Sequence, residues 1–242
     1  MLKPLFLLTI FTSWYISAES IRVVTEHLPP YQIVKNGQVV GGSSYAIMKE
    51  VLKRAKIDVI HEALPWARAY KTALSRDNTI IYSITRSLER EPLFRWIGQL
   101  YSQKYSFFSA KANKNIHIKT TSDALNYMAV AVRDSFEADS LQHIGFEVGG
   151  NLMLVVDYST VWKMLHMGRA DITYADSPVH GGSNLDESLF KKQGVHIEAL
   201  EVYVAANINT DEKVLDNLSA ALQSVKKDPL FKKLFNIQKK KL

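Results

Sequence analysis

The sequence TIIYSITRSLER, residues 79–90, leads from a predicted strand into a polar loop. Residues 79–82 are apolar or β-branched, a composition typical of a buried strand. Two hydroxyl side chains, Ser83 and Thr85, come at the end of this run. In open α/β sheets, ligands lie beyond the carboxyl ends of the strands. The stretch therefore predicts a strand whose end contributes Ser83 and Thr85 to a ligand site.

Two arginines in the same loop extend this prediction to an anionic group. Arg86 and Arg90 each carry a planar guanidinium, which can form two parallel, charge-assisted hydrogen bonds with a carboxylate. The loop also contains Glu89 and Glu91. An alternative interpretation is a solvated surface loop in which these four charges pair with one another and contribute little.

The rest of the chain alternates strand-like and helix-like segments. Before the loop, strands are predicted at 21–25, 57–64 and 79–84, with helices from Ser43 or Ser44 to 55 and from Pro65 to 74. After the loop, strands are predicted at 105–110, 128–132, 152–157, 170–175 and 201–208. Helices are predicted after a Ser122 cap, at 136–144, at 160–167 after a Ser159 cap, at 185–192, from Asp211 to 225 and at 228–235. This order predicts an α/β fold with mostly parallel sheets covered by helices.

Residues 1–18 have the pattern of a secretory signal peptide. Lys3 gives a positive start, residues 5–10 an apolar segment, and residues 16–18 a small-residue end suited to cleavage. The alternative is that this segment is the first strand or helix of the fold. No later stretch reaches the ~18 apolar residues of a membrane span, and the absence of Cys excludes a lipid-anchored lipoprotein. We expect a soluble, exported protein of the periplasm.

Composition and motifs exclude several classes of function. The 242 residues are 47% hydrophobic and 22% charged, which suits one large domain or two lobes of about 100 residues each. The net charge of +6 lies largely in lysine pairs near the end of the chain, so we expect no nucleic-acid partner. The seven histidines form no metal-binding motif, and no nucleophile elbow or phosphate-binding glycine loop occurs. We expect no metal, no cofactor and no enzyme activity.

Polar and aromatic side chains recur at the predicted strand ends in both halves of the chain. Glu26 and Trp66 follow the first two strands, Arg133 and Ser135 follow the strand at 128–132, and Asp176 follows the strand at 170–175. Two lobes that face each other by their strand ends would gather these groups around one cleft. Alternatively, Trp66 is a core residue, Arg133 pairs with a neighbouring carboxylate, and Asp176 caps a turn.

These landmarks resemble the family 3 extracellular solute-binding proteins, the periplasmic amino-acid-binding components of ABC importers. The resemblance rests on the first loop at 25–31, the Ser-x-Thr-x-x-x-x-Arg stretch at 83–90, the Arg-Asp-Ser start of a helix at 133–135, and the Gly-Arg-Ala-Asp segment at 168–176. It covers nearly the whole chain after the signal peptide. It implies a two-lobed fold with two crossover strands: lobe 1 at 19–104 and 201–242, and lobe 2 at 105–200.

The resemblance also implies roles for three side chains. Arg90 would hold the α-carboxylate of an amino acid, Asp176 its α-amine, and Tyr31 would pack on its side chain. The chain departs from the family pattern at 42–45 and at 65–69, where it reads Gly-Ser-Ser-Tyr and Pro-Trp-Ala-Arg-Ala. These departures affect the expected ligand more than the expected fold.

The expected function is capture of a small polar solute, an amino acid or similar zwitterion, by cleft closure and delivery to an ABC importer. The expected partner is a membrane permease or sensor, and the chain itself is expected to be a monomer. Two alternatives remain open: a sensor subunit that presents its closed form to a membrane receptor, and a lyase or dehydratase on the same fold. In the latter, a cleft acid such as Glu26 or Asp134 would act as general base.

Overall fold

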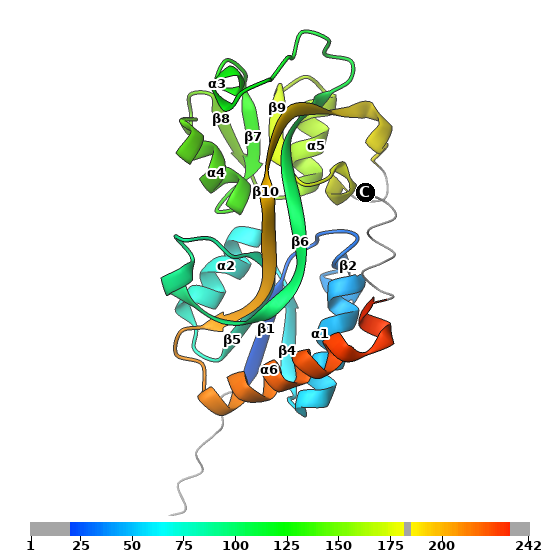
Figure 1. The fold of residues 1–242 in the computed structure, drawn as a ribbon, viewed down its shortest axis with the longest axis vertical. Helices are drawn as coiled ribbons and strands as arrows, with labels where there is room; N and C mark the ends of the chain where they lie inside the picture. The colour runs from blue at the N-terminus through cyan, green and yellow to red at the C-terminus, as the bar shows by residue number, and fades with distance from the viewer. Residues whose placement is uncertain (1–19, 182–184, 233–242) are drawn as a thin grey trace, which may run out of the picture.

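The computed structural model describes residues 20–181 and 185–232, which form two α/β lobes joined by two long strands (Figure 1). The predicted signal peptide lies outside the described residues, as does the end of the helix predicted at 228–235. The predicted fold class, two lobes each with a mostly parallel sheet flanked by helices, is confirmed.

The first lobe is built around three parallel strands. Strand β1 pairs with β4 on one side and with β5 on the other. The elements of this lobe are β1 (Ile21–Thr25), the hairpin β2 (Ile33–Lys35) and β3 (Gln38–Gly41), α1 (Ser43–Ala55), β4 (Val59–Ala63), α2 (Trp66–Ser75), β5 (Thr79–Thr85), the 3-10 turn η1 (Glu91–Leu93) and α6 (Glu212–Lys227). Helix α6 packs on α1, so the chain returns to this lobe at its end (Figure 1).

The second lobe repeats the arrangement with shorter strands. Strand β7 pairs in parallel with β8 and β9. Its elements are α3 (Thr121–Ala124), β7 (Ala129–Val132), α4 (Phe136–Ile144), β8 (Leu152–Val155), α5 (Tyr158–His166), β9 (Ile172–Ala175), and the 3-10 turns η2 (Pro178–Gly181) and η3 (Glu187–Leu189).

Two long antiparallel strands, β6 (Phe94–Ala110) and β10 (Phe190–Asn207), connect the lobes. β10 pairs with β5 in the first lobe, and β6 pairs with β9 in the second. The eight strands therefore form one sheet in the order β4-β1-β5-β10-β6-β9-β7-β8. The expected lobe boundaries at 104/105 and 200/201 fall within these crossover strands and stay a prediction.

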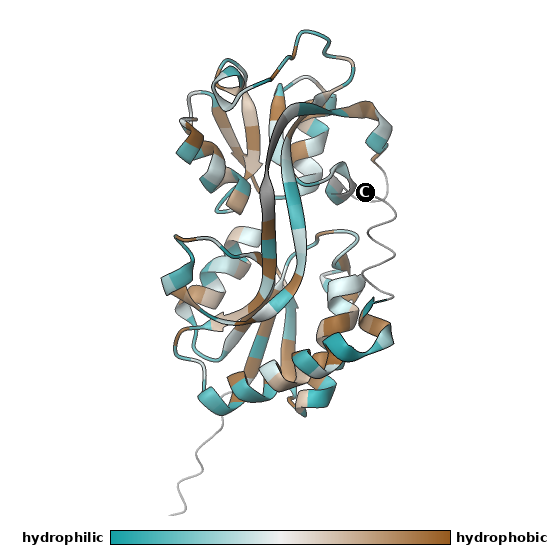
Figure 2. Cartoon of the chain, in the orientation of Figure 1, coloured by the Kyte–Doolittle hydropathy of each residue, from teal (hydrophilic) through white to brown (hydrophobic). Residues whose placement is uncertain are grey.

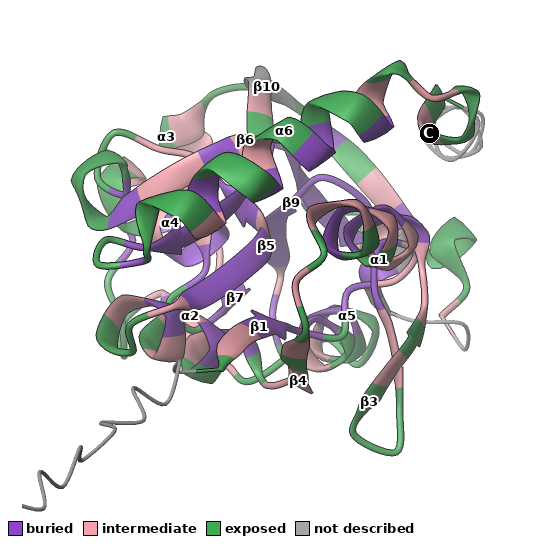
Figure 3. Cartoon of the chain, turned by 90° about the horizontal axis from the view of Figure 1, so that it is seen from below, coloured by how far each residue is buried: buried purple, intermediate pink, exposed green. Residues whose placement is uncertain are grey.

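Apolar side chains gather on the inner faces of helices and strands, as Figure 2 shows by hydropathy and Figure 3 by burial. Tyr82 and Met48 are almost fully buried in the first lobe, and Trp162 of α5 and Phe107 of β6 in the second. Because each strand is covered by helices on both sides, β7 reads as a continuous buried run, AVAV. The carboxyl ends of the parallel strands face the space between the lobes.

Several predicted boundaries differ from the structure. The N-cap of helix α1 is Gly42, and neither Ser43 nor Ser44 caps it; α3 is capped by Thr120 and not Ser122, and α5 by Asp157 and not Ser159. The helix predicted at 185–192 is only the turn η3, after which β10 begins at Phe190. Strands β6 and β10 also extend beyond the predicted 105–110 and 201–208 because each continues through both lobes.

Candidate ligand-binding cleft

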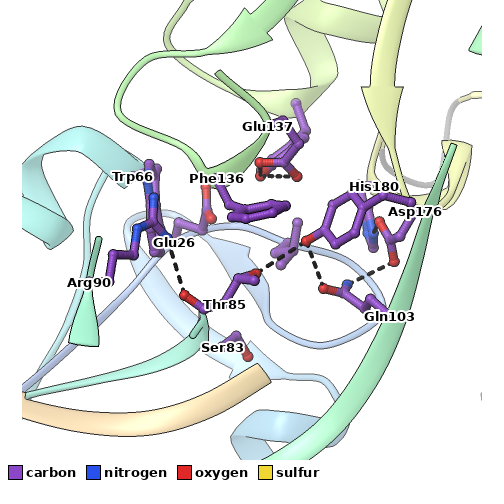
Figure 4. Close-up of a pocket in the computed structure, with 13 residues that line it drawn as sticks. Glu26, Trp66, Ser83, Thr85, Arg90, Gln103, Phe136, Glu137, Asp176 and His180 are labelled. Carbon is purple, nitrogen blue, oxygen red and sulfur yellow. Dashed lines mark hydrogen bonds and ion pairs between the residues drawn. The ribbon is translucent and has the colours of Figure 1, made fainter. Parts of the chain in front are cut away.

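A pocket between the lobes is lined by side chains from both of them and from the crossover strand β6 (Figure 4). The lining residues are Glu26, Leu28, Trp66, Ser83, Thr85, Arg90, Gln103, Tyr105, Phe136, Glu137, Tyr158, Asp176 and His180. Six residues predicted from the sequence are among them: Glu26, Trp66, Ser83, Thr85, Arg90 and Asp176. The structure thus brings together groups that lie at the end of strand β5 or follow strands β1, β4, β5 and β9.

A β-bulge brings Ser83 to the pocket. In the pairing of β5 with β10, Ile84 and Tyr82 have consecutive partners, so Ser83 is an extra residue on β5. Its φ of 62° is left-handed, an uncommon backbone conformation that bulges accommodate and that recurs at binding sites. Gln32 donates a side-chain hydrogen bond to the Ser83 hydroxyl. The neighbouring Thr85 hydroxyl lies 3.2 Å from the Tyr105 hydroxyl, from β6.

Arg90 lies almost completely buried, with 2% of its surface exposed, and it contacts the second lobe. Its Nη2 donates to the carbonyl of Asp134 at 3.2 Å and to a carboxylate oxygen of Asp139 at 3.0 Å. Its guanidinium also lies 5.7 Å from the ring of Trp66 and 5.0 Å from that of Tyr70, within the range of cation–π attraction. Arg90 therefore bridges the lobes.

The turn at Asp134 makes this bridge possible. Asp134 has a φ of 57°, and its carbonyl accepts a hydrogen bond from Trp66 Nε1 at 2.6 Å in addition to that from Arg90. The side chain of Asp134 itself is exposed. Two donors of the first lobe thus meet one carbonyl of the second, just before helix α4 begins.

On the opposite side of the pocket, Asp176 forms a buried pair with His180 (Figure 4). His180 Nε2 lies 2.5 Å from one oxygen of Asp176, and the other oxygen accepts from Gln103 Nε2 at 2.7 Å. His180 Nδ1 lies 2.6 Å from the carbonyl of Pro29 in the first lobe. Both ring nitrogens face oxygen acceptors, which the imidazolium with its two N–H donors satisfies. Burial lowers the pKa of His180, but the Asp176 carboxylate, the Pro29 carbonyl and Glu137 together raise it more, so the net shift is upward.

Glu26 and Glu137 are two further acids buried in the pocket. Both oxygens of Glu137 accept from the Tyr158 hydroxyl, at 2.9 and 3.0 Å. Burial is the main cause that raises the pKa of Glu26 well above its usual range, with repulsion from Glu137 and Asp157 adding to it. Burial also raises the pKa of Glu137, although its hydrogen bonds oppose the shift.

Three predicted site residues do not line the pocket. Tyr31 is buried and stacks on Tyr101, with ring centroids 4.3 Å apart, and its ring lies 5.5 Å from that of the lining residue His180. Arg133 is exposed at the surface of the second lobe. The Ser135 hydroxyl accepts from the backbone N–H of Ala138, which makes it the N-cap of helix α4.

The structure adds lining residues that the sequence did not single out. Gln103 and Tyr105 come from the middle of crossover strand β6, whose position across the cleft depends on the assembled sheet. Glu137 is buried in the first turn of α4, and a carboxylate two residues after a capping serine was the available signal. His180 follows Asp176 by four residues, a spacing that could have suggested the pair.

The described residues contain no cluster of three His, Asp or Glu side chains placed to hold a metal ion. None of the helices in the described ranges is long and apolar enough to cross a membrane.

A two-lobed α/β fold whose inter-lobe cleft is lined by charged and aromatic side chains defines a solute-binding protein. The model of the bacterial extracellular solute-binding proteins, family 3, matches residues 21–237, and the chain belongs to this family. A search of curated proteins returns no match to the chain.

Solved structures share the fold at low sequence identity. An ancestral arginine-binding protein bound to arginine is 19% identical, with a TM-score of 0.74 and coverage of 90% of this chain and 96% of that one. A histidine kinase sensor domain with similarity to periplasmic binding proteins is 15% identical, with a TM-score of 0.77 and coverage of 90% and 94%. An amino acid ABC transporter substrate-binding protein from Streptococcus pneumoniae, bound to L-arginine, is 14% identical, with a TM-score of 0.74 and coverage of 90% and 92%.

Proposed function

We propose that this chain is an exported binding protein, not an enzyme, that captures a small polar solute by closing its two lobes and delivers it to an ABC importer. The solute class is an amino acid or a similar small charged molecule. The observation that carries the proposal is the polar pocket between the lobes, with Glu26, Arg90 and Asp176 buried at its walls. The similarity to arginine-binding proteins and to a transporter component supports the same class of ligand.

Contacts across the cleft support closure as the binding step. Arg90 and Trp66 of the first lobe donate to the backbone of Asp134, and His180 of the second lobe contacts the Pro29 carbonyl. These contacts can form only when the lobes approach each other. A ligand that binds between the lobes would therefore shift the population toward the closed form.

A thermal-shift screen tests the ligand class. The mature protein, beginning near Glu19, is screened against amino acids, amines, dicarboxylates and short peptides. A ligand at ~100 times its Kd stabilises the folded state by about 2.7 kcal/mol. Small-angle scattering with a hit at saturation should show a more compact particle. A screen without any stabilising solute, or an unchanged scattering curve, would contradict capture by closure.

A sensor role is the second candidate, because the fold also matches a histidine kinase sensor domain. In that case the closed form would be presented to a membrane receptor and not to a permease. Deletion of the gene separates the two: loss of uptake of the radiolabelled solute supports transport, whereas intact uptake with a lost transcriptional response supports sensing.

Export is tested by fractionation. We expect a soluble periplasmic protein from which residues 1–18 have been removed. A chain that retains these residues and stays with the membrane would contradict this part of the proposal.

A further inference from the structure

Arg90 already has an acid of the protein as its partner. Its Nη2 donates to the Asp139 carboxylate and to the Asp134 carbonyl. A ligand carboxylate binds a guanidinium through two parallel N–H···O hydrogen bonds. The two donors are either Nη1 and Nη2 or Nε and Nη2, so each pair of donors needs one Nη2 hydrogen. Nη2 already donates to these two acceptors, whereas Nε has no hydrogen-bond partner among the described residues. Neither pair of donors of Arg90 is therefore free to bind the carboxylate of a solute in this arrangement.

Asp176 is likewise partnered. One of its oxygens faces the His180 ring and the other accepts from Gln103. The charge of this acid is balanced by the imidazolium, so a cationic ligand group gains less from Asp176 than from an acid without a partner.

Glu26 is the acid without a partner. It is 6% exposed and lines the pocket, and no hydrogen bond or ion pair to its carboxylate occurs within residues 20–181 and 185–232. Glu137 accepts from the neutral hydroxyl of Tyr158, and it forms no ion pair within the same ranges. Removal of a carboxylate from water costs free energy that a bound cation would offset.

An aromatic side chain lies beside the two acids. Phe136 lines the pocket next to Glu137, and Figure 4 shows its ring between Glu26 and the Asp176–His180 pair. Its ring packs on Tyr105 at 5.2 Å between centroids, which fixes its position. The face of an aromatic ring attracts cations, so Phe136 complements the acids beside it.

We propose that the cleft binds a small organic cation, with an ammonium or guanidinium group held by Glu26 and Glu137, and that the ligand needs no carboxylate. The inference rests on the proposed function and specifies the charge of the solute. Burial, together with repulsion from Glu137 and Asp157, disfavours the ionised form of Glu26 in the free protein. A bound cation reverses this effect by pairing with the ionised carboxylate.

Calorimetric titration of the mature protein with three matched pairs tests the proposal. Each pair is an amino acid and its decarboxylated counterpart: L-ornithine and putrescine, L-lysine and cadaverine, L-arginine and agmatine. We expect at least one amine to bind as tightly as its parent amino acid or more tightly. Amino acids that bind while every amine is 100-fold weaker would overturn the inference but leave the proposed function intact.

Two further outcomes complete the titration series. Binding of L-glutamine or L-glutamate alone would overturn the cationic ligand and would still support solute capture. Binding of none of these compounds, nor of any other solute in the screen, would overturn both the inference and the proposed function.

Isosteric variants assign the effect to the two acids. Glu26→Gln and Glu137→Gln should each weaken binding of the best amine by about 30-fold or more, because a buried charge pair is lost. Glu147→Gln, an exposed position of the same lobe as Glu137, is the matched control and should bind like the parent. Circular dichroism and melting curves establish that each variant is folded. Unchanged affinity in both cleft variants would overturn the proposed site, and either variant suffices if the other does not fold.

Discussion

Asp139→Asn distinguishes two roles for Arg90. In the first, Asp139 and Arg90 form a contact between the lobes that stabilises the closed form. In the second, Asp139 only occupies Arg90 until a ligand carboxylate replaces it. The ion pair is 3.0 Å long, and the Arg90 side chain is 3% exposed whereas that of Asp139 is 43% exposed. Asparagine keeps the shape of the side chain and an oxygen acceptor but removes the charge.

The expected magnitude follows from this geometry. A hydrogen bond to a charged group contributes about 1.5–3 kcal/mol and a neutral one about 0.5–1.5 kcal/mol, so loss of the charge costs about 1 kcal/mol. Solvent at the half-exposed Asp139 keeps the effect at the lower end of this range. Because the contact exists only when the lobes meet, the loss reduces the closed population and weakens every ligand by about fivefold.

The assay is calorimetric titration of the parent, Asp139→Asn and the control Asp216→Asn, an exposed aspartate on helix α6. Each is titrated with one amino acid and its decarboxylated counterpart. Equal weakening of both ligands in Asp139→Asn supports a contact that serves closure. If the amino acid instead binds more tightly and the amine does not, Arg90 is a carboxylate clamp that Asp139 inhibits, and the closure argument is refuted.

Three other changes test separate parts of the structure. As pH rises above the usual pKa of a glutamate, the parent should lose stability relative to Glu26→Gln, because the raised pKa of Glu26 makes its ionisation unfavourable in the folded state. Melting curves between pH 4 and 8 in which the parent gains stability relative to the variant would contradict this. Gly42→Ala should lower the free energy of unfolding by more than about 1 kcal/mol in urea titrations, since φ is +106° and the new Cβ would clash with the carbonyl oxygen of Tyr31. Gly37→Ala, with φ +75° and open space, is its control and should lose less; equal losses would show that the close approach is unimportant. Arg86→Ala should change ligand affinity less than twofold, because Arg86 pairs with Glu91 at the surface, and a loss of tenfold would assign the ligand contact of this loop to Arg86.

The fold was largely predictable because its signals are local. The alternation of buried β-branched runs with amphipathic helices is present in the sequence around 79–85 and 129–132, and it requires a parallel sheet covered by helices. The crossover strands were less predictable. Strand β10 continues from one lobe into the other through a segment that contains Lys191, Lys192 and Gly194, and such residues favour a loop when read alone.

The candidate site was predictable where it depends on strand ends. Thr85 and Asp176 each follow or end a recognisable strand, and both lie in the pocket. Side chains whose position depends on the whole assembly gave no local signal. Gln103 reaches the pocket from the middle of a crossover strand, whereas Tyr31 stacks on Tyr101 at 4.3 Å and is not among the lining residues.

The partners of Arg90 show why a residue can be located from a sequence more readily than its role. The loop at 83–90 identifies an arginine beside a strand end, and the structure places it in the pocket. Its charge, however, is balanced by Asp139, which lies forty-nine residues away on the other lobe. A sequence pattern contains no information on the contact between Arg90 and Asp139, since this contact arises only when helix α4 packs toward the first lobe. A ligand carboxylate would therefore compete with Asp139 for Arg90, and the sign of the change in ligand affinity of Asp139→Asn measures that competition directly.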